Sequence, residues 1–211
     1  MACVHRERLS FLKNKGFFPA IIYDIGAFNG WWTWDIQPVF PASQFFLFEA
    51  NEVHAKDLSA LNCKYFINLL GDAEKESDFY SINLTGDSVF IERTSAYIGK
   101  PVLQRRQMTT LSSLVQKQQI PLPDLVKLDV QGAEKIVIQG GCDIVSHAEV
   151  IILETRLIEY NMGAPLIYEL MTLMNDLNYQ MVDVVGANYL NTQELVEMDV
   201  LFIKKKSKLI R

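Results

Sequence analysis

The 211-residue sequence lacks the features that mark several large classes of protein. It has only three cysteines, which are far apart, with no Cys-x-x-Cys pair and no Cys/His cluster, so neither a disulfide framework nor a zinc site is predicted. We expect Cys63 and Cys142 to be small core residues. No apolar run approaches the roughly 20 residues of a membrane span, and the N-terminus lacks the apolar core of a signal peptide. We therefore expect a cytoplasmic protein without a membrane span.

The sequence also lacks an excess of basic charge. Its net charge is -5, which disfavours a dedicated nucleic-acid binder, because such a surface is usually basic. The apolar share of 49% is enough to fill a sizeable core. The length suits one α/β domain that spans residues 1–211.

Apolar runs and helical patterns alternate along the chain. We expect strands at 20–25, 45–49, 65–70, 125–128, 150–153, 181–184 and 200–203. We expect helices at 5–15, 29–37, 52–60, 111–119, 132–139 and 165–177. Continuous apolar strands between helices predict a mostly parallel sheet that is covered on both faces.

Three segments lie outside this alternation. Residues 1–16 contain an N-terminal helix whose Leu9, Phe11 and Leu12 are expected to face inward. Short alternating segments predict a hairpin at 77–95, within an insertion or lid over 77–108. Residues 204–211 are a lysine-rich tail, in which Lys204, Lys205 and Lys206 are expected to be solvated.

The first strand runs directly into a Gly-x-x-x-Gly turn from Gly26 to Gly30, and Asp24 lies just before that turn. Glycines allow the backbone to approach a ligand closely. Glu49 ends the second strand, where an acidic side chain can bind two ribose hydroxyls. This layout is typical of a nucleoside-binding βαβ unit.

The identity of the nucleoside follows partly from two missing motifs. Neither the Gly-x-Gly-x-x-Gly dinucleotide pattern nor the phosphate-cradling Gly-rich loop is present. Asp72 and Asp129 follow the third and fourth strands, so four acidic positions share the carboxyl edge of the sheet. Such an edge suits a ligand with hydroxyls, an amine and a cationic centre, and it does not suit a pyrophosphate.

S-adenosylmethionine has these groups. In this interpretation Glu49 accepts hydrogen bonds from the ribose, and Asp72 accepts one from the adenine amine. Gly26 and Gly30 allow close approach of the methionine end, and Asp24 anchors its amine through the turn.

Three motifs together carry a family resemblance: residues 24–30, 48–51 and 125–134. With them the sequence resembles the FkbM family of S-adenosylmethionine-dependent methyltransferases, from about residue 16 to 204. The resemblance implies a Rossmann-like class I fold with a seven-stranded, mostly parallel sheet and an antiparallel last strand. It also implies O-methylation, often of sugar or polyketide hydroxyls, with S-adenosylhomocysteine as the product. The cofactor-binding positions are then Asp24, Gly26, Ala27, Phe28, Gly30, Trp31, Glu49, Ala50, Asn51, Gly71, Asp72, Asp129 and Val130.

The acidic residues after the fourth and fifth strands are candidates for the chemistry. Asp129 is the first candidate for a base or for positioning of the acceptor, and Glu134 either supports it or is a helix-start carboxylate favoured by the helix dipole. Asp129 and Glu154 could share a magnesium ion, but a surface pair of Glu154 with Arg156 is the favoured interpretation, and we predict no metal ligand. Gln131 departs from the family, where an acidic residue is more usual.

The acceptor cannot be derived from the sequence beyond a hydroxyl on a small molecule or glycan. Aromatic residues and Arg105 and Arg106 in the insertion would suit a sugar or an acidic molecule. His54 and His147 are expected to be solvated. Two alternatives stay open: a non-catalytic cofactor-binding relative that acts as a partner protein, and an NAD-dependent oxidoreductase.

Overall fold

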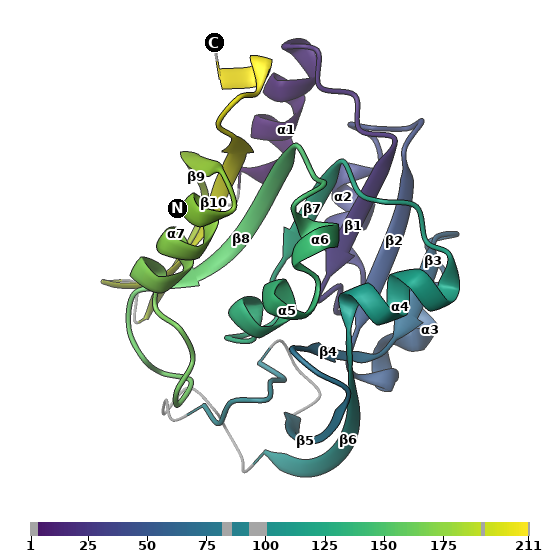
Figure 1. The fold of residues 1–211 in the computed structure, drawn as a ribbon, viewed down its shortest axis with the longest axis vertical. Coiled ribbons are helices and arrows are strands. Elements are labelled where there is room, and N and C mark those ends of the chain that lie inside the picture. The colour runs from purple at the N-terminus through teal and green to yellow at the C-terminus, as the bar shows by residue number, and fades with distance from the viewer. Residues whose placement is uncertain (1–3, 82–85, 93–100, 191–192, 211) are drawn as a thin grey trace.

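The computed structural model describes residues 4–81, 86–92, 101–190 and 193–210. A seven-stranded sheet with the order β3-β2-β1-β7-β8-β10-β9 forms its centre (Figure 1). The strands are β1 (Ile21–Ile25), β2 (Gln44–Glu49), β3 (Lys64–Ile67), β7 (Leu125–Leu128), β8 (Val150–Arg156), β9 (Tyr179–Leu190) and β10 (Glu194–Lys204). The first five in spatial order are parallel, and β10 runs antiparallel to both β8 and β9. The predicted seven-stranded sheet with an antiparallel last strand is confirmed.

Helices cover both faces of this sheet, because its central strands are buried and mostly apolar. One face packs against α1 (His5–Asn14), α2 (Trp31–Ile36) and α3 (Ala55–Ser59), which follows the short 3-10 helix η1 (Glu52–His54). The other face packs against α4 (Leu111–Gln118), α5 (Glu134–Gly140), α6 (Cys142–Val145) and α7 (Ile167–Asp176). A threonine caps α4 at its N-terminus, since Thr110 Oγ1 accepts from the Ser113 amide at 3.0 Å.

A second, three-stranded sheet has the order β4-β6-β5 and lies below the carboxyl edge of the main sheet in Figure 1. Its strands are β4 (Leu69–Gly71), β5 (Lys75–Ser81) and β6 (Val102–Thr110). The hairpin predicted at 77–95 is wrong in its pairing, because β5 pairs with β6, while Tyr80 meets Ser88 only in an isolated bridge. Parts of that predicted hairpin, 82–85 and 93–95, lie outside the described residues.

The third predicted strand, 65–70, is divided between the two sheets. Its first part is β3 at the edge of the main sheet, and its second part is β4 in the small sheet. The change of sheet occurs at Asn68, whose amide still donates to the Glu49 carbonyl at 2.9 Å. This change of direction carries the chain from the main sheet into the inserted sheet.

Two predictions about burial are wrong, and a third holds in part. Lys205 and Lys206 are exposed as predicted, but the 3-10 helix η2 (Lys208–Ile210) that follows them packs its Leu209 into the core beside α1. Phe11 is 48% exposed, so α1 buries His5, Leu9 and Leu12 instead. Cys142 is exposed, whereas Cys63 is half-buried. In the described part of the chain, no helix combines the length and apolarity that a membrane crossing requires.

Candidate active site

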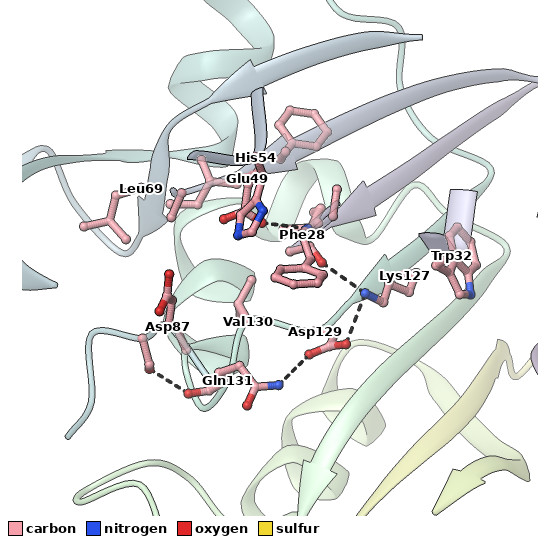
Figure 2. Close-up of a pocket in the computed structure, with 18 of the residues that line it drawn as sticks. Phe28, Trp32, Glu49, His54, Leu69, Asp87, Lys127, Asp129, Val130 and Gln131 are labelled. Atoms are coloured by element: carbon pink, nitrogen blue, oxygen red, sulfur yellow. Dashed lines mark hydrogen bonds and ion pairs between the residues drawn. The ribbon is translucent and has the colours of Figure 1, made fainter. Parts of the chain in front are cut away.

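A cavity of about 260 Å³ opens at the carboxyl ends of β1, β2 and β7 (Figure 2). Open parallel sheets bind their ligands at this edge. The volume of the cavity is close to the lower limit of roughly 300 Å³ for small-ligand pockets. The wall comes from the glycine turn, the tips of β2 and β7, the inserted sheet, α1 and β10. One end of the cavity is apolar, the other end is charged, and Glu49 lies between them.

The glycine turn is held between the tips of β2 and β7. Gly26 has a φ of 78°, and a Cβ at this position would lie 1.7 Å from the Asp129 carbonyl oxygen, so the two backbones approach too closely for any side chain. The amides of Gly26 and Ala27 both donate to the Phe48 carbonyl. Phe28 adopts a φ of 51°, which is uncommon for an aromatic residue, and its ring packs on His54 with 4.3 Å between centroids. The turn therefore forms a fixed floor of the cavity.

Glu49 is fixed by the backbone around it. Its Oε2 accepts from the Phe28 amide and its Oε1 from the Asn51 amide, each at 2.7 Å. Burial raises the pKa of this carboxyl, and the two backbone amides oppose that shift. The result is a carboxylate of fixed orientation in the wall of the cavity.

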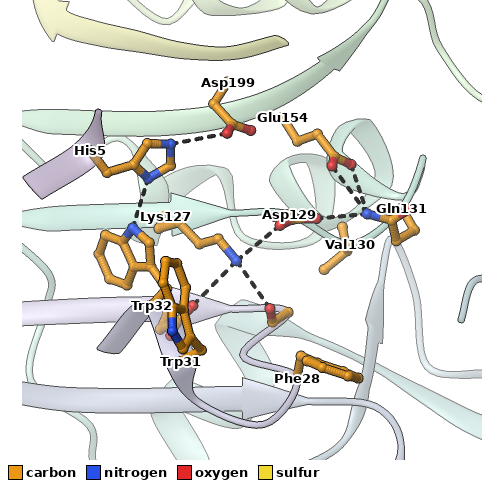
Figure 3. A network of polar contacts seen from close by, with 12 residues as sticks. His5, Phe28, Trp31, Trp32, Lys127, Asp129, Val130, Gln131, Glu154 and Asp199 are labelled. Atoms are coloured by element: carbon orange, nitrogen blue, oxygen red, sulfur yellow. Dashed lines mark hydrogen bonds and ion pairs between the residues drawn. The ribbon is translucent and has the colours of Figure 1, made fainter. Parts of the chain in front are cut away.

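Lys127, which the sequence analysis missed, lies at the charged end of the cavity. Its Nζ donates to the Gly26 carbonyl at 3.1 Å and pairs with Asp129 Oδ2 at 3.1 Å and Asp24 Oδ1 at 3.6 Å. Burial disfavours its charge, but Asp129 and Asp24 outweigh this effect and raise the pKa of Lys127. Lys127 thus joins β1, the glycine turn and the tip of β7 (Figure 3).

Asp129 is held from two sides. Lys127 contacts its Oδ2, and the side-chain amide of Gln131 donates to its Oδ1 at 2.9 Å. Partial burial opposes ionisation, yet Lys127 and Gln131 together hold the pKa of Asp129 below its usual value. The same Gln131 amide donates to Glu154, 3.1 Å from its Oε1, so it lies between the two carboxylates that could share a magnesium ion.

Glu154 and Arg156 form a pair, but it is buried rather than at the surface. Arg156 contacts Glu154 at 2.8 Å and Glu134 at 3.2 Å, and the three side chains are each at most 4% exposed. Glu134 also accepts from the amides of Val130 and Gly132, at 3.0 Å and 3.1 Å. Glu134 therefore shapes the loop after β7 and does not face the cavity.

The charged end is completed by residues from both ends of the chain. Trp32 Nε1 donates to His5 Nδ1 at 2.8 Å, and His5 Nε2 lies 3.0 Å from Asp199 Oδ2 (Figure 3). Because the indole N–H can only donate, Nδ1 accepts and Nε2 carries the proton toward Asp199. His5, Trp32 and Asp199 all line the cavity.

The structure divides the predicted site residues into two groups. Those that line the cavity are Gly26, Ala27, Phe28, Trp31, Glu49, Ala50, Asp129 and Val130. Those outside its wall are Asp24, Gly30, Asn51, Gly71, Asp72 and Glu134.

The second group has other contacts. Asp24 is fully buried behind the turn and accepts from Thr33 Oγ1 at 2.7 Å, and burial raises its pKa. Asp72 is exposed and pairs with Lys75. Gly30 precedes α2 as its left-handed N-cap, and Gly71 packs beneath Gly140 of α5. The expected contacts of Asp24 with the methionine amine and of Asp72 with adenine therefore have no support in this geometry.

Several wall residues had no predicted role, namely His5, His54, Asn68, Leu69, Asp87, Ser88, Lys127, Gln131 and Asp199. His54, predicted to be solvated, is only 7% exposed, whereas His147 is exposed as predicted. Arg105 and Arg106 are not in the wall, since Arg105 pairs with Asp78 and Arg106 donates to the Ala50 carbonyl. Lys127 was the residue with a usable signal, because it is a single charge within an apolar strand.

The chain is similar to one known protein family and to several solved structures. A family model described as "Methyltransferase FkbM domain" matches residues 24–181, and no curated protein sequence matches. An uncharacterized protein from Listeria monocytogenes is 10% identical, with a TM-score of 0.54, over 98% of this chain and 70% of its own. A proposed tRNA methyltransferase from Streptococcus pneumoniae, in complex with S-adenosyl-L-methionine, is 11% identical, with a TM-score of 0.51, over 96% and 74%. A proposed O-methyltransferase from Klebsiella pneumoniae is 11% identical, with a TM-score of 0.51, over 95% and 81%.

Proposed function

Because this chain belongs to the FkbM family of S-adenosylmethionine-dependent methyltransferases, we propose that it methylates a hydroxyl of a small-molecule or glycan acceptor. The observation that carries this proposal is the polarity of the cavity. An apolar end, a fixed carboxylate in the middle and a charged end follow one another in the same order as the purine, the ribose diol and the charged amino-acid part of the cofactor.

The residues present suit each part of the cofactor. Glu49, held by two backbone amides, presents carboxylate oxygens that can accept from the ribose hydroxyls. At the charged end, the ammonium of Lys127 pairs with Asp129, and Asp199 also lines the cavity, so groups of both signs are present to complement an α-amino acid zwitterion. When bound, S-adenosylmethionine supplies an electrophilic methyl group on a sulfonium centre.

Asp129 is the residue of this chain that we assign to the acceptor. It is the carboxylate at the tip of β7, it lines the cavity, and its side chain is 31% exposed. Lys127 and Gln131 hold it ionised and in one orientation. In this position it can accept a hydrogen bond from the acceptor hydroxyl, and it takes the proton as that oxygen becomes an ether. A positioned base contributes about 10²–10⁴ in rate, and orientation contributes up to roughly 7–11 kcal/mol.

A nucleic-acid acceptor is less well supported than a small molecule. The net charge of -5 and the acidic groups around the cavity would repel a phosphate backbone. One solved neighbour is described as a tRNA methyltransferase, but it is 11% identical, so this likeness extends to the fold alone.

The experiment that tests the proposed function is calorimetric titration with S-adenosylmethionine, S-adenosylhomocysteine and NAD. We expect the first two to bind and NAD not to bind, and Glu49→Gln to weaken binding at least tenfold, because the ribose hydroxyls lose a charged acceptor. Asp72→Asn, at an exposed position outside the cavity, is the matched control and should bind like the parent chain.

Two results would refute this assignment of the cofactor. One is preference for NAD, and the other is equal affinity for S-adenosylhomocysteine in the parent chain and Glu49→Gln. Hydroxyl methylation is then tested by transfer of labelled methyl groups to a panel of hydroxyl acceptors, where Asp129→Asn should lose at least a hundredfold in rate.

A further inference from the structure

The apolar end of the cavity contains one carboxylate from the insertion, Asp87, which lies outside the strands of the small sheet. It lies on segment 86–92, which follows β5 and borders the cavity (Figure 2). Two backbone hydrogen bonds anchor this segment to β5, from the Tyr80 amide to the Ser88 carbonyl at 2.8 Å and from the Ser88 amide to the Tyr80 carbonyl at 3.1 Å. Ser88 Oγ also donates to the Gln131 carbonyl at 2.6 Å. Asp87 is therefore carried by a segment that is fixed to both sheets.

The carboxylate of Asp87 is itself held in place. Its Oδ2 accepts from Asn51 Nδ2 at 2.6 Å and from Ser81 Oγ at 2.9 Å. Asn51 and Ser81 are 5% and 1% exposed, and the Asn51 side chain also accepts from the Val53 amide. Asn51 follows Glu49 by two residues, so this contact couples the tip of β2 to the inserted sheet.

The surroundings of Asp87 suit a purine ring. Three apolar residues of the cavity wall, Leu69, Phe79 and Val89, pack together in one apolar cluster. They can cover the faces of a flat ring, but a buried amine without an acceptor would lose hydrogen-bonding free energy. The Asp87 carboxylate supplies a charged acceptor at this end. Burial is the main cause of the raised pKa of Glu49, and the negative charge of Asp87 adds a smaller contribution in the same direction.

We propose that Asp87 accepts a hydrogen bond from the exocyclic amine of adenine, so that segment 86–92 takes part in recognition of the nucleobase. This inference rests on the proposed function, since it requires that the cavity binds S-adenosylmethionine. It gives Asp87 the role that the sequence analysis assigned to Asp72, which lies outside the cavity.

The test compares S-adenosylhomocysteine with S-inosylhomocysteine, in which an oxo group replaces the amine and the ribose and amino acid are unchanged. Calorimetry on the parent chain should give a preference of about 10- to 100-fold for the adenosyl compound, as for one hydrogen bond to a charged group. Asp87→Asn keeps the shape and an oxygen for Asn51 and Ser81, but it presents an amide donor, so it should abolish or invert the preference. Asp87→Ala should abolish it without inversion, and Asp72→Asn should retain it.

The outcomes separate the two proposals. If the parent chain binds neither compound, the proposed function fails. If the parent chain binds S-adenosylhomocysteine but shows no preference, or if Asp87→Asn weakens both compounds by the same factor, the role of Asp87 in adenine recognition is refuted. Thermal unfolding of each variant without ligand shows whether a change in binding reflects a loss of fold.

Discussion

Glu49 combines burial with a binding role that requires its charge. It is 8% exposed, and burial raises its pKa above the ordinary glutamate value of 4.5. The ionised form is the better acceptor for ribose hydroxyls, so affinity for S-adenosylhomocysteine should be complete well above the raised pKa. The affinity should fall as the pH drops through the raised pKa of Glu49, at pH values where an exposed glutamate would still be ionised.

This pH dependence can be measured by calorimetry from about pH 8 to about pH 5. Glu49→Gln should bind more weakly and lose this part of the pH dependence. An unchanged pH profile in the variant would assign the titration to another group.

Loss of the Lys127 side chain should destabilise the fold, because Lys127 compensates a buried negative charge. It is 8% exposed and pairs with Asp24, which is fully buried. Lys127→Met leaves the Asp24 charge without its partner, so the free energy of unfolding should fall by about 3–5 kcal/mol. Burial raises the pKa of Asp24, so the deficit should shrink as the pH falls through that pKa and the carboxyl becomes neutral.

Urea unfolding measures this loss, and the double variant Lys127→Met with Asp24→Asn should recover part of it. Additive losses in the double variant would show that the two side chains are not coupled. Strand residues such as Val126 and Leu128 are predictable from their apolar pattern. The contacts of Lys127 with Asp24 and Gly26 are not, because these residues lie about a hundred positions away along the chain.

The packing of α5 on the inserted sheet depends on one glycine. A Cβ at Gly140 would lie 1.9 Å from the backbone oxygen of Gly71. Gly140→Ala would gain helix propensity, yet it must separate α5 from β4, and we expect a net loss of about 1–3 kcal/mol in unfolding free energy. Gln139→Ala, at an exposed position of the same helix, is the matched control and should change stability by less than about 0.5 kcal/mol.

Urea unfolding of Gly140→Ala and Gln139→Ala measures the change in unfolding free energy of each variant. Equal stabilities would mean that α5 and β4 can separate without cost. The sequence pattern predicts that a helix ends at Gly140. It does not predict the close approach of Gly140 to Gly71, because these two residues are 69 positions apart in the chain.

Strand β6 of the inserted sheet is the element that the sequence pattern did not predict. Strand β6 carries Gln104, Arg105, Arg106 and Gln107, and most of its residues are exposed, so it lacks the apolar alternation that marks a half-buried strand. Its pairing with β5 crosses residues 82–101, a separation that no local pattern specifies. The main-sheet strands were predictable because they are buried on both faces and read as continuous apolar runs.

For the whole molecule, cofactor binding should appear as thermal stabilisation. S-adenosylhomocysteine at about 100 times its dissociation constant contributes roughly 2.7 kcal/mol to the folded state. For a chain of 211 residues this corresponds to an increase in Tm of about 5–11 °C. Differential scanning calorimetry should show this increase for the parent chain, and Glu49→Gln at the same ligand concentration should show a much smaller one. An equal increase in both would place binding outside the Glu49 cavity.

The cavity is a property of the complete fold. His5 and Asp199 line it although both lie outside the matched segment, 24–181, and they meet because α1 packs on β9 and β10 beside the parallel strands. Removal of either terminal region would therefore change the charged end of the cavity as well as the stability of the fold.

The sequence by itself determined the strands of the main sheet, most of the helices that cover it, the glycine turn and the carboxylate at the tip of β2. These features are carried by neighbouring residues, whose apolar period and backbone preferences act locally. The tertiary structure decided which acidic residues face the cavity: Glu49, Asp87, Asp129 and Asp199 do, whereas Asp24 and Asp72 do not. It also decided that Lys127 joins three segments at the charged end. The reason is physical, because burial and charge pairing depend on distances between residues that are remote in the chain, and these distances exist only after the sheets have assembled.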